Sequence, residues 1–115
     1  MDEAPSTGKI LVAPGVLITV ARLAALSVPG VVRMSPVSGG VNRLFRLGAS
    51  RGVRLDTRGD EISAELFVVM SSESSAREVG RKVREEVARA ITEIVGLKVG
   101  EIIVHIEDVD SPPPE

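Results

Sequence analysis

The chain has 115 residues, of which 43% are hydrophobic and 26% are charged, so it has room for one domain with one hydrophobic core. It contains no cysteine, which excludes disulfides and thiolate metal sites and favours a reducing compartment. The formal net charge is −2, and the only Phe, Tyr or Trp residues are Phe45 and Phe67, so the core must be built from aliphatic side chains.

The two ends of the chain differ in composition from the segment between them. Residues 1–7 and 110–115 are polar, contain proline and show no apolar period. Such segments cannot bury enough apolar surface to order themselves. We therefore expect disordered tails on either side of a single domain at residues 8–109.

The most apolar stretch covers residues 10–32 and raises the question of a membrane span. Pro14, Arg22 and Pro29 interrupt it, and each uninterrupted piece is shorter than the ~20 residues that a span needs. We expect a buried strand and a buried helix here and no transmembrane segment.

Two strands and one helix are predicted in the first third of the chain. Residues 9–13 form a short apolar strand, and Pro14 suits the first position of a helix, where its missing N–H would be unpaired anyway. The helix extends to about Ser27 and has few polar residues, so we expect it to be buried on most sides. Residues 28–30 end it, and residues 31–37 form a second strand.

The middle of the chain predicts a loop followed by a hairpin. Residues 38–50 form a flexible segment that contains an apolar and basic island. Residues 52–58 and 61–70 are two strands, joined at Gly59 and Asp60 by a hairpin turn.

The clearest helix follows Ser75. Ser75 and Glu78 have the spacing of a capping box, in which the hydroxyl accepts from the Glu78 amide and the carboxylate reaches back. Apolar residues then recur at three- and four-residue steps as far as Ile94, and Gly96 fits the left-handed position after a helix. Residues 101–109 form the last strand.

The predicted order is β-α-β-β-β-α-β, an α+β two-layer sandwich with two helices on one face of a mostly antiparallel sheet. The other face of that sheet must meet water or a partner. Period-two alternation in the last two strands places four candidate partner-binding residues there, among charged neighbours: Phe67, Val69, Ile103 and His105. A solvated face and a protein-binding or self-association surface are equally good interpretations.

Charge is distributed unevenly along the chain. Residues 33–58 contain six arginines and one aspartate, whereas residues 101–115 contain five acidic residues and no lysine or arginine. Arg43, Phe45 and Arg46 are candidate partner-binding residues, because they place an apolar tip among guanidinium groups.

Three interpretations of the Arg-rich loop at residues 43–58 stay open. Its apolar residues fold back onto the core, or it contacts anionic lipid at a membrane surface, or it binds nucleic acid through phosphates. The lack of stacking aromatics and a sequence pI of about 5.5 count against nucleic acid.

Groups for catalysis are scarce in the sequence. His105 is the only histidine, and with no cysteine a zinc site would depend on carboxylates. No phosphate-binding loop or dinucleotide motif is present, and no base is indicated beside a serine. We expect no catalytic residues, no cofactor and no metal, and therefore not an enzyme.

The pattern resembles the alkaline-shock-protein family of bacteria, also called the envelope stress response family, across residues 8–109. The likeness is carried by aliphatic residues and glycines: Gly8-Lys9-Ile10, the helix around residues 21–25, Val28-Pro29-Gly30-Val31, Gly52-Val53-Arg54-Leu55, residues 62–69, residues 79–87, Gly96-Leu97-Lys98-Val99 and residues 103–109.

The resemblance implies a small cytoplasmic protein linked to cell-envelope stress, without enzymatic activity or cofactor. Such proteins are thought to act as scaffolds, some of them held near the membrane by a separate anchor protein. We therefore expect a non-catalytic interaction protein that self-associates or docks onto a membrane-associated partner. We expect it in the cytoplasm, peripheral at the inner face of the membrane.

Overall fold

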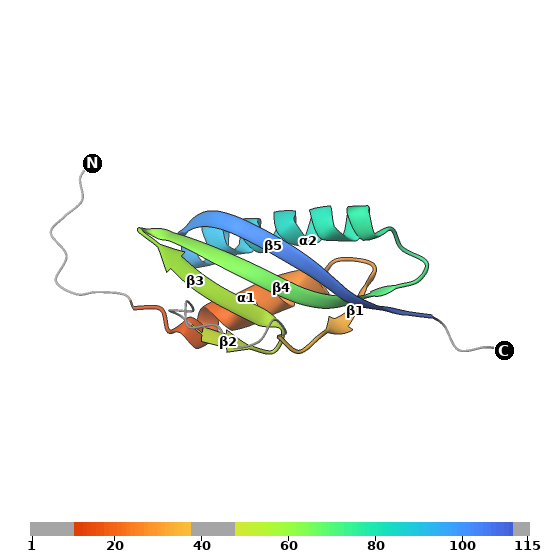
Figure 1. The fold of residues 1–115 in the computed structure, drawn as a ribbon. Helices are drawn as coiled ribbons and strands as arrows, with labels where there is room; N and C mark the ends of the chain where they lie inside the picture. The colour runs from red at the N-terminus through yellow and green to blue at the C-terminus, as the bar shows by residue number, and fades with distance from the viewer. Residues whose placement is uncertain (1–10, 38–47, 112–115) are drawn as a thin grey trace, which may run out of the picture.

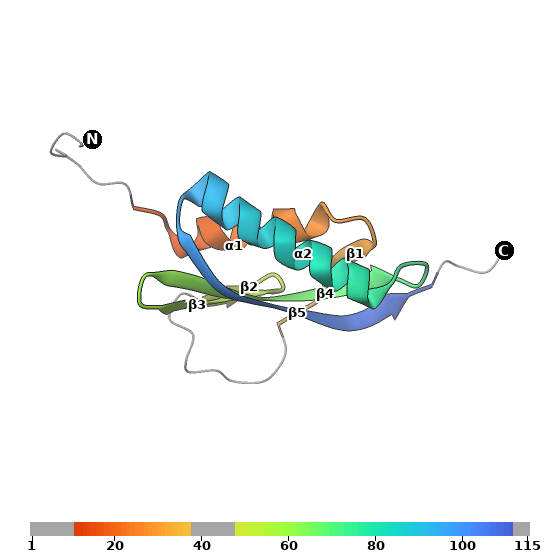
Figure 2. The same cartoon turned by 90° about the horizontal axis from the view of Figure 1, so that it is seen from above.

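The computed structural model describes residues 11–37 and 48–111. Figure 1 shows the elements, which in chain order are α1 (Pro14–Leu26), β1 (Val31–Met34), β2 (Gly48–Ser50), β3 (Val53–Arg58), β4 (Glu61–Ser71), α2 (Ala76–Ala90), the π-helix η1 (Ile91–Val95) and β5 (Lys98–Asp110). Both helices lie on one face of the sheet (Figure 2). The predicted α+β class, with two helices against a mostly antiparallel sheet, is confirmed.

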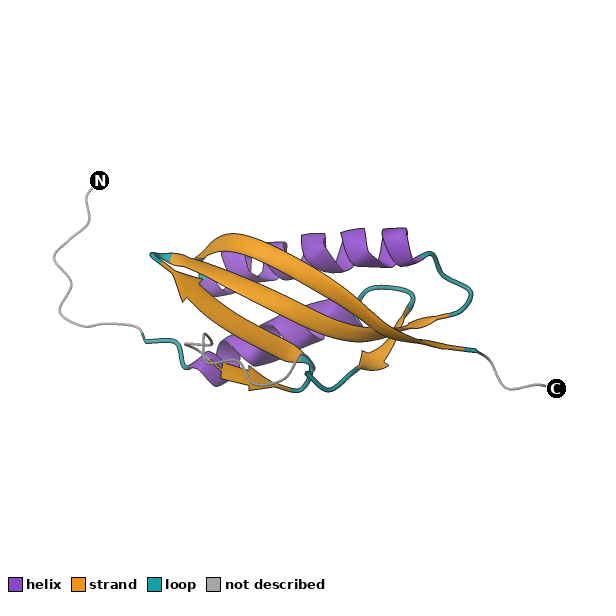
Figure 3. Cartoon of the chain, viewed as in Figure 1, coloured by secondary structure: helices purple, strands orange, loops and turns teal. Residues whose placement is uncertain are grey.

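Strand β4 is the centre of the sheet (Figure 3). On one side it pairs in parallel with β5 along its whole length. On its other side it pairs antiparallel with β3 in its first half and with β1 in its second half, and β2 adds to β3. Phe67 joins β1 and β3 end to end, because its N–H donates to Gly52 O and its C=O accepts from Ser35 N, both at 2.8 Å.

The core lies between the sheet and the helices. Every second residue of β4, from Ile62 to Met70, faces α1 and α2 and is buried. Helix α2 packs against them through Val79, Val83 and Val87, and η1 adds Ile91, so these buried side chains follow one another at four-residue steps. The packed side chains are aliphatic, as the composition requires.

Two predictions about the strands were wrong. Of the strand predicted at residues 9–13, Leu11, Val12 and Ala13 are irregular, and residues 9 and 10 lie outside the described residues. These three residues lead into α1, where Ala13 O accepts from Val16 N at 2.9 Å. Strand β2 was not predicted, because its three residues have no strand pattern of their own and are ordered by pairing with β3.

The acidic end of the chain is also ordered further than expected. Asp110, assigned above to a disordered tail, is the last residue of β5. Its carboxylate accepts from Arg33 Nη1 at 2.6 Å, which ties the end of β5 to β1 across β4.

Candidate functional site

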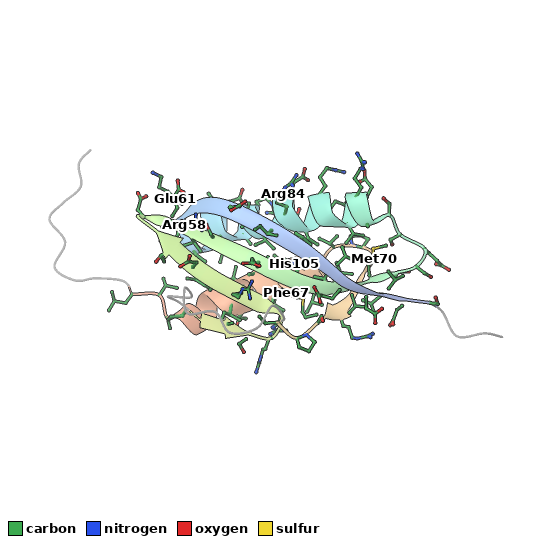
Figure 4. The ribbon with its side chains drawn as sticks, viewed as in Figure 1. Arg58, Glu61, Phe67, Met70, Arg84 and His105 are labelled. Atoms are coloured by element: carbon green, nitrogen blue, oxygen red, sulfur yellow. The ribbon has the colours of Figure 1, made fainter. Side chains whose placement is uncertain are left out.

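The outer face of the sheet, away from the helices, carries a compact polar cluster. Arg54 on β3, Glu65 and Phe67 on β4, and His105 on β5 are neighbours through strand register, in which Arg54 lies opposite Glu65 and Phe67 lies opposite His105. Figure 4 shows Phe67 and His105 together in the middle of the sheet. We call these four residues the outer cluster.

One carboxylate oxygen organises the outer cluster. Oε1 of Glu65 accepts from Nη2 of Arg54 at 2.7 Å and lies 2.7 Å from Nε2 of His105. The imidazole stacks on Phe67 with ring centroids 4.4 Å apart and planes within 4°. The Arg54 guanidinium lies 5.3 Å from the Phe67 centroid, which is cation–π distance.

The electrostatics of the cluster favour an ionised Glu65. Burial acts to raise the pKa of Glu65, but hydrogen bonds from Arg54 and His105, together with the positive charge of Arg54, outweigh it, and the pKa of Glu65 is lowered. An ionised carboxylate only accepts, so Nε2 of His105 carries a proton in this arrangement.

This packing corrects the sequence-based view of the outer face. Phe67 and Val69 were expected to be exposed, but Phe67 is 1% exposed and Val69 is buried. Alternation assigned them to the correct face, yet the flanking side chains close over Phe67. Of the four predicted residues, only Ile103 is an exposed large apolar residue, and the His105 side chain is about one-third exposed.

The structure describes only residues 48–58 of the Arg-rich loop at residues 43–58. Arg43, Phe45 and Arg46 lie outside the described residues. Among the later arginines, Arg54 is engaged with Glu65, whereas Arg58 is exposed and lies 3.8 Å from Asp56. Within residues 11–37 and 48–111, no group of three or more His, Cys, Asp or Glu residues could hold a metal ion.

An exposed apolar surface lies on the helical layer, where the sequence predicted burial. Only one stripe of α1 is buried, whereas Val16 is 50% and Leu23 is 55% exposed. Val16, half-buried Val20 and Leu23 follow one another at helical spacing along the same side of α1. Sequence analysis missed this surface, although the small number of polar residues in the helix was a signal for it.

Ile94 of η1 extends the apolar surface. The sequence pattern placed Ile94 with the core residues of α2, but its side chain is 72% exposed. The reason is the π turn, in which Gly96 N donates to Ile91 O at 3.0 Å and residues lose the register of the preceding α-helix. Leu23 and Ile94 line one groove of about 210 Å³ together with Val20, Ala24 and Ala90. We call Val16, Val20, Leu23 and Ile94 the α1 face.

Variants of MamM CTD are among the solved structures with a similar fold. One aligns with a TM-score of 0.50 at 15% identity, covering 86% of this chain and 96% of that chain. A second has a TM-score of 0.50 at 16% identity, covering 85% and 96% respectively. Identities this low establish the shared fold and nothing further.

Sequence relatives give a closer assignment. The chain is 30% identical over 101 residues to the uncharacterized protein YqhY of Bacillus subtilis (strain 168), covering 86% of this chain and 75% of YqhY. It is 26% identical over 106 residues to the uncharacterized protein YloU of the same organism, covering 89% and 88% respectively. No helix of the described residues is long and apolar enough to cross a membrane.

Residues 2–111 match the model of the ASP23 (alkaline shock protein) family, described as having a cell envelope-related function. The match spans the aliphatic and glycine positions on which the resemblance was based, so the predicted family is confirmed. The chain belongs to the ASP23 family, whose function is related to the cell envelope.

Proposed function

We propose that this protein is a non-catalytic interaction protein of the cell envelope that binds another protein through the α1 face. One observation carries the proposal: Val16, Val20 and Leu23 form an apolar side of α1 that the fold does not bury. An apolar stripe on a helix normally faces a core. The side left open by this chain is therefore available to a partner.

The composition of the α1 face supports a protein partner. Leu23 and Ile94 line the groove with the smaller residues Val20, Ala24 and Ala90, and charged Glu86 and Arg89 line it too. Protein interfaces usually combine apolar residues with polar ones in this way. Clustered exposed apolar residues of this kind mark sites where a protein binds a partner.

A second copy of the chain is the simplest partner. The four residues of the α1 face carry no charge, so an identical face can cover them without an unpaired charge on either side. A two-fold interface made of one patch on both subunits is also the commonest form of self-association. A membrane-associated protein is the other partner to test.

A non-catalytic role is supported by the state of the lone histidine. His105 is held by the Glu65 carboxylate and by the Phe67 ring. These contacts give the imidazole a structural role within the sheet.

We further propose that the protein works in the cytoplasm, peripheral at the inner face of the membrane. This location fits the cysteine-free sequence and the envelope-related family.

The test is the association state of Leu23→Glu and Ile94→Glu, measured by sedimentation velocity over a wide concentration range. Because a buried glutamate in an apolar interface is costly, each change should weaken self-association by about tenfold or more. Ile103→Glu is the matched control, since it places the same charge on the sheet face.

Two results would contradict the proposal. In the first, the parent stays monomeric at every concentration and captures no envelope protein after crosslinking in native lysate. In the second, Ile103→Glu disrupts association whereas Leu23→Glu and Ile94→Glu do not. Phe67 is unsuitable for this test, because a charge at so buried a position would unfold the sheet.

A further inference from the structure

A second concave site lies on the side of α1 away from the groove of the α1 face. It is a notch of about 560 Å³ between the end of α1, strand β1 and the turn that joins β2 to β3. This volume is in the range of small-molecule sites. Its lining is apolar over most of the surface, through Leu26, Val32, Met34 and Pro36.

Arginines surround this apolar lining. Arg22 of α1, Arg33 of β1 and Arg51 of the β2–β3 turn all line the notch, and no acidic residue does. Arg33 is paired with Asp110. Arg22 is not: its Nε is buried and has no hydrogen-bond partner. A buried donor left without an acceptor is uncommon in a folded protein and calls for an explanation.

The second observation is the backbone of Arg51. Arg51 has φ +53°, and it is the one described non-glycine residue with positive φ. Arg51 and Gly52, at φ +81°, form a two-residue hairpin turn that favours Asn-Gly. An arginine is unfavourable there, and strain of this kind is typical of functional positions.

The position of the turn is also fixed. A Cβ on Gly52 would lie 2.7 Å from Ser35 O and 2.8 Å from Met34 Cβ, so only glycine allows the turn to approach β1 this closely. This close approach holds Arg51 in the lining of the notch, to which Arg22 also belongs.

We propose that the notch binds a phosphate group carried on an alkyl chain, with the chain against Leu26 and Met34 and the phosphate between Arg22 and Arg51. Guanidinium groups bind phosphate through charge-assisted, often paired, hydrogen bonds. Because Nε of Arg22 is buried, the Arg22 guanidinium would turn toward the notch to donate to the phosphate, which would relieve the unpaired Nε. The phosphate would also explain an arginine at a turn position that favours asparagine.

The probe is octyl phosphate, titrated by calorimetry into the full chain. Saturable binding is expected, and inorganic phosphate and octanol, which each supply half of the ligand, should bind about tenfold more weakly or worse. Absence of octyl phosphate binding, or equal affinity for inorganic phosphate, would overturn the assignment.

Three variants separate the site from general charge. Arg51→Gly and Arg22→Met should each weaken octyl phosphate binding by about tenfold. Arg51→Gly should also raise the thermal midpoint, because glycine relieves the strained φ. Arg84→Gln on α2 (Figure 4) removes an exposed arginine elsewhere and should leave affinity unchanged. An equal loss of octyl phosphate affinity in Arg84→Gln, or unchanged affinity in both site variants, would contradict the proposal.

Vesicles identify the source of the ligand. If phosphatidylglycerol vesicles bind the parent but not Arg51→Gly, while phosphatidylcholine vesicles bind neither, the ligand is a membrane lipid. If octyl phosphate binds and vesicles do not, the ligand is a free amphiphile. Both results support the site. The α1-face variants should behave like the parent in each assay, so failure here is distinct from failure of the proposed interface.

Discussion

At Gly52 the fold leaves no room for a side chain. An added Cβ would meet Ser35 O and Met34 Cβ at 2.7 and 2.8 Å, and φ is +81°. Gly52→Ala should therefore lower the free energy of unfolding by about 1–3 kcal/mol, measured by urea denaturation. Gly80→Ala is the control: apart from the backbone of its own helix, nothing lies within 4 Å of its added Cβ, and alanine in a helix interior should raise the free energy of unfolding by about 0.5–1 kcal/mol. If both variants lost similar free energy of unfolding, the close approach of the turn to β1 would not be the reason why position 52 requires glycine.

Glu65 should make part of the stability depend on pH. Its pKa is lowered in the fold from an ordinary value of 4.5, so its ionised form stabilises the protein above that pH. This contribution is lost as the pH falls through the lowered pKa. Glu65→Gln should cost about 1–3 kcal/mol at neutral pH, because Arg54 and His105 lose a charged acceptor.

The measurement is the urea midpoint from neutral pH down to about pH 3. The parent should lose stability over the acidic part of this range more steeply than Glu65→Gln. Glu101→Gln, at an exposed position on β5, should keep the parent's slope. If Glu65→Gln titrates like the parent, the outer cluster does not stabilise the fold in the way its geometry indicates.

Among the elements, α2 tests the capping box that the sequence predicted at Ser75 and Glu78. The predicted cap at Ser75 is present, with its Oγ accepting from Glu78 N at 3.4 Å. The return half of the capping box is absent, because Glu78 Oε1 accepts from Arg81 Nη2 at 2.7 Å instead. Ser75→Ala should lower the free energy of unfolding by about 1 kcal/mol, measured by thermal melting, and Ser72→Ala outside the helix should change it little. Equal effects would contradict a capping role.

The elements that the sequence predicted well are those specified by their own residues. The periodicity of α2, the β3–β4 hairpin and the left-handed Gly96, at φ +82°, are local features. Which side of α1 stays exposed depends on how the other elements pack against it, and the local sequence of α1 does not contain that information. The burial of Phe67 depends on its pairing with His105 across β4 and β5, and this register is fixed only when the sheet assembles.

At the scale of the whole molecule, β4 should be the last strand to open. It is bonded to β1 and β3 on one side and to β5 on the other, whereas β2 is a three-residue edge strand. Amides within strongly paired, buried strands exchange only through large openings. Hydrogen exchange followed by NMR should find the slowest amides at residues 66–68 and fast amides in β2. Equal protection of both strands would contradict this hierarchy.

The free edge of β5 decides between two ways in which copies of the molecule could join. Along the described part of the chain, β5 pairs only with β4, so its other edge offers unpaired amides to a neighbouring molecule. Two register shifts, opposite Ile62/Ala64 and Val68/Val69, interrupt this edge, and such bulges protect edges from pairing. If copies meet through the α1 face, the outward amides of residues 102–106 should exchange quickly at low and at high protein concentration alike. Signals of Leu23 and Ile94 should shift with concentration over the same range. Slowed exchange along β5 without shifts at Leu23 would instead make this edge the interface, since strand addition would then be what holds the copies together.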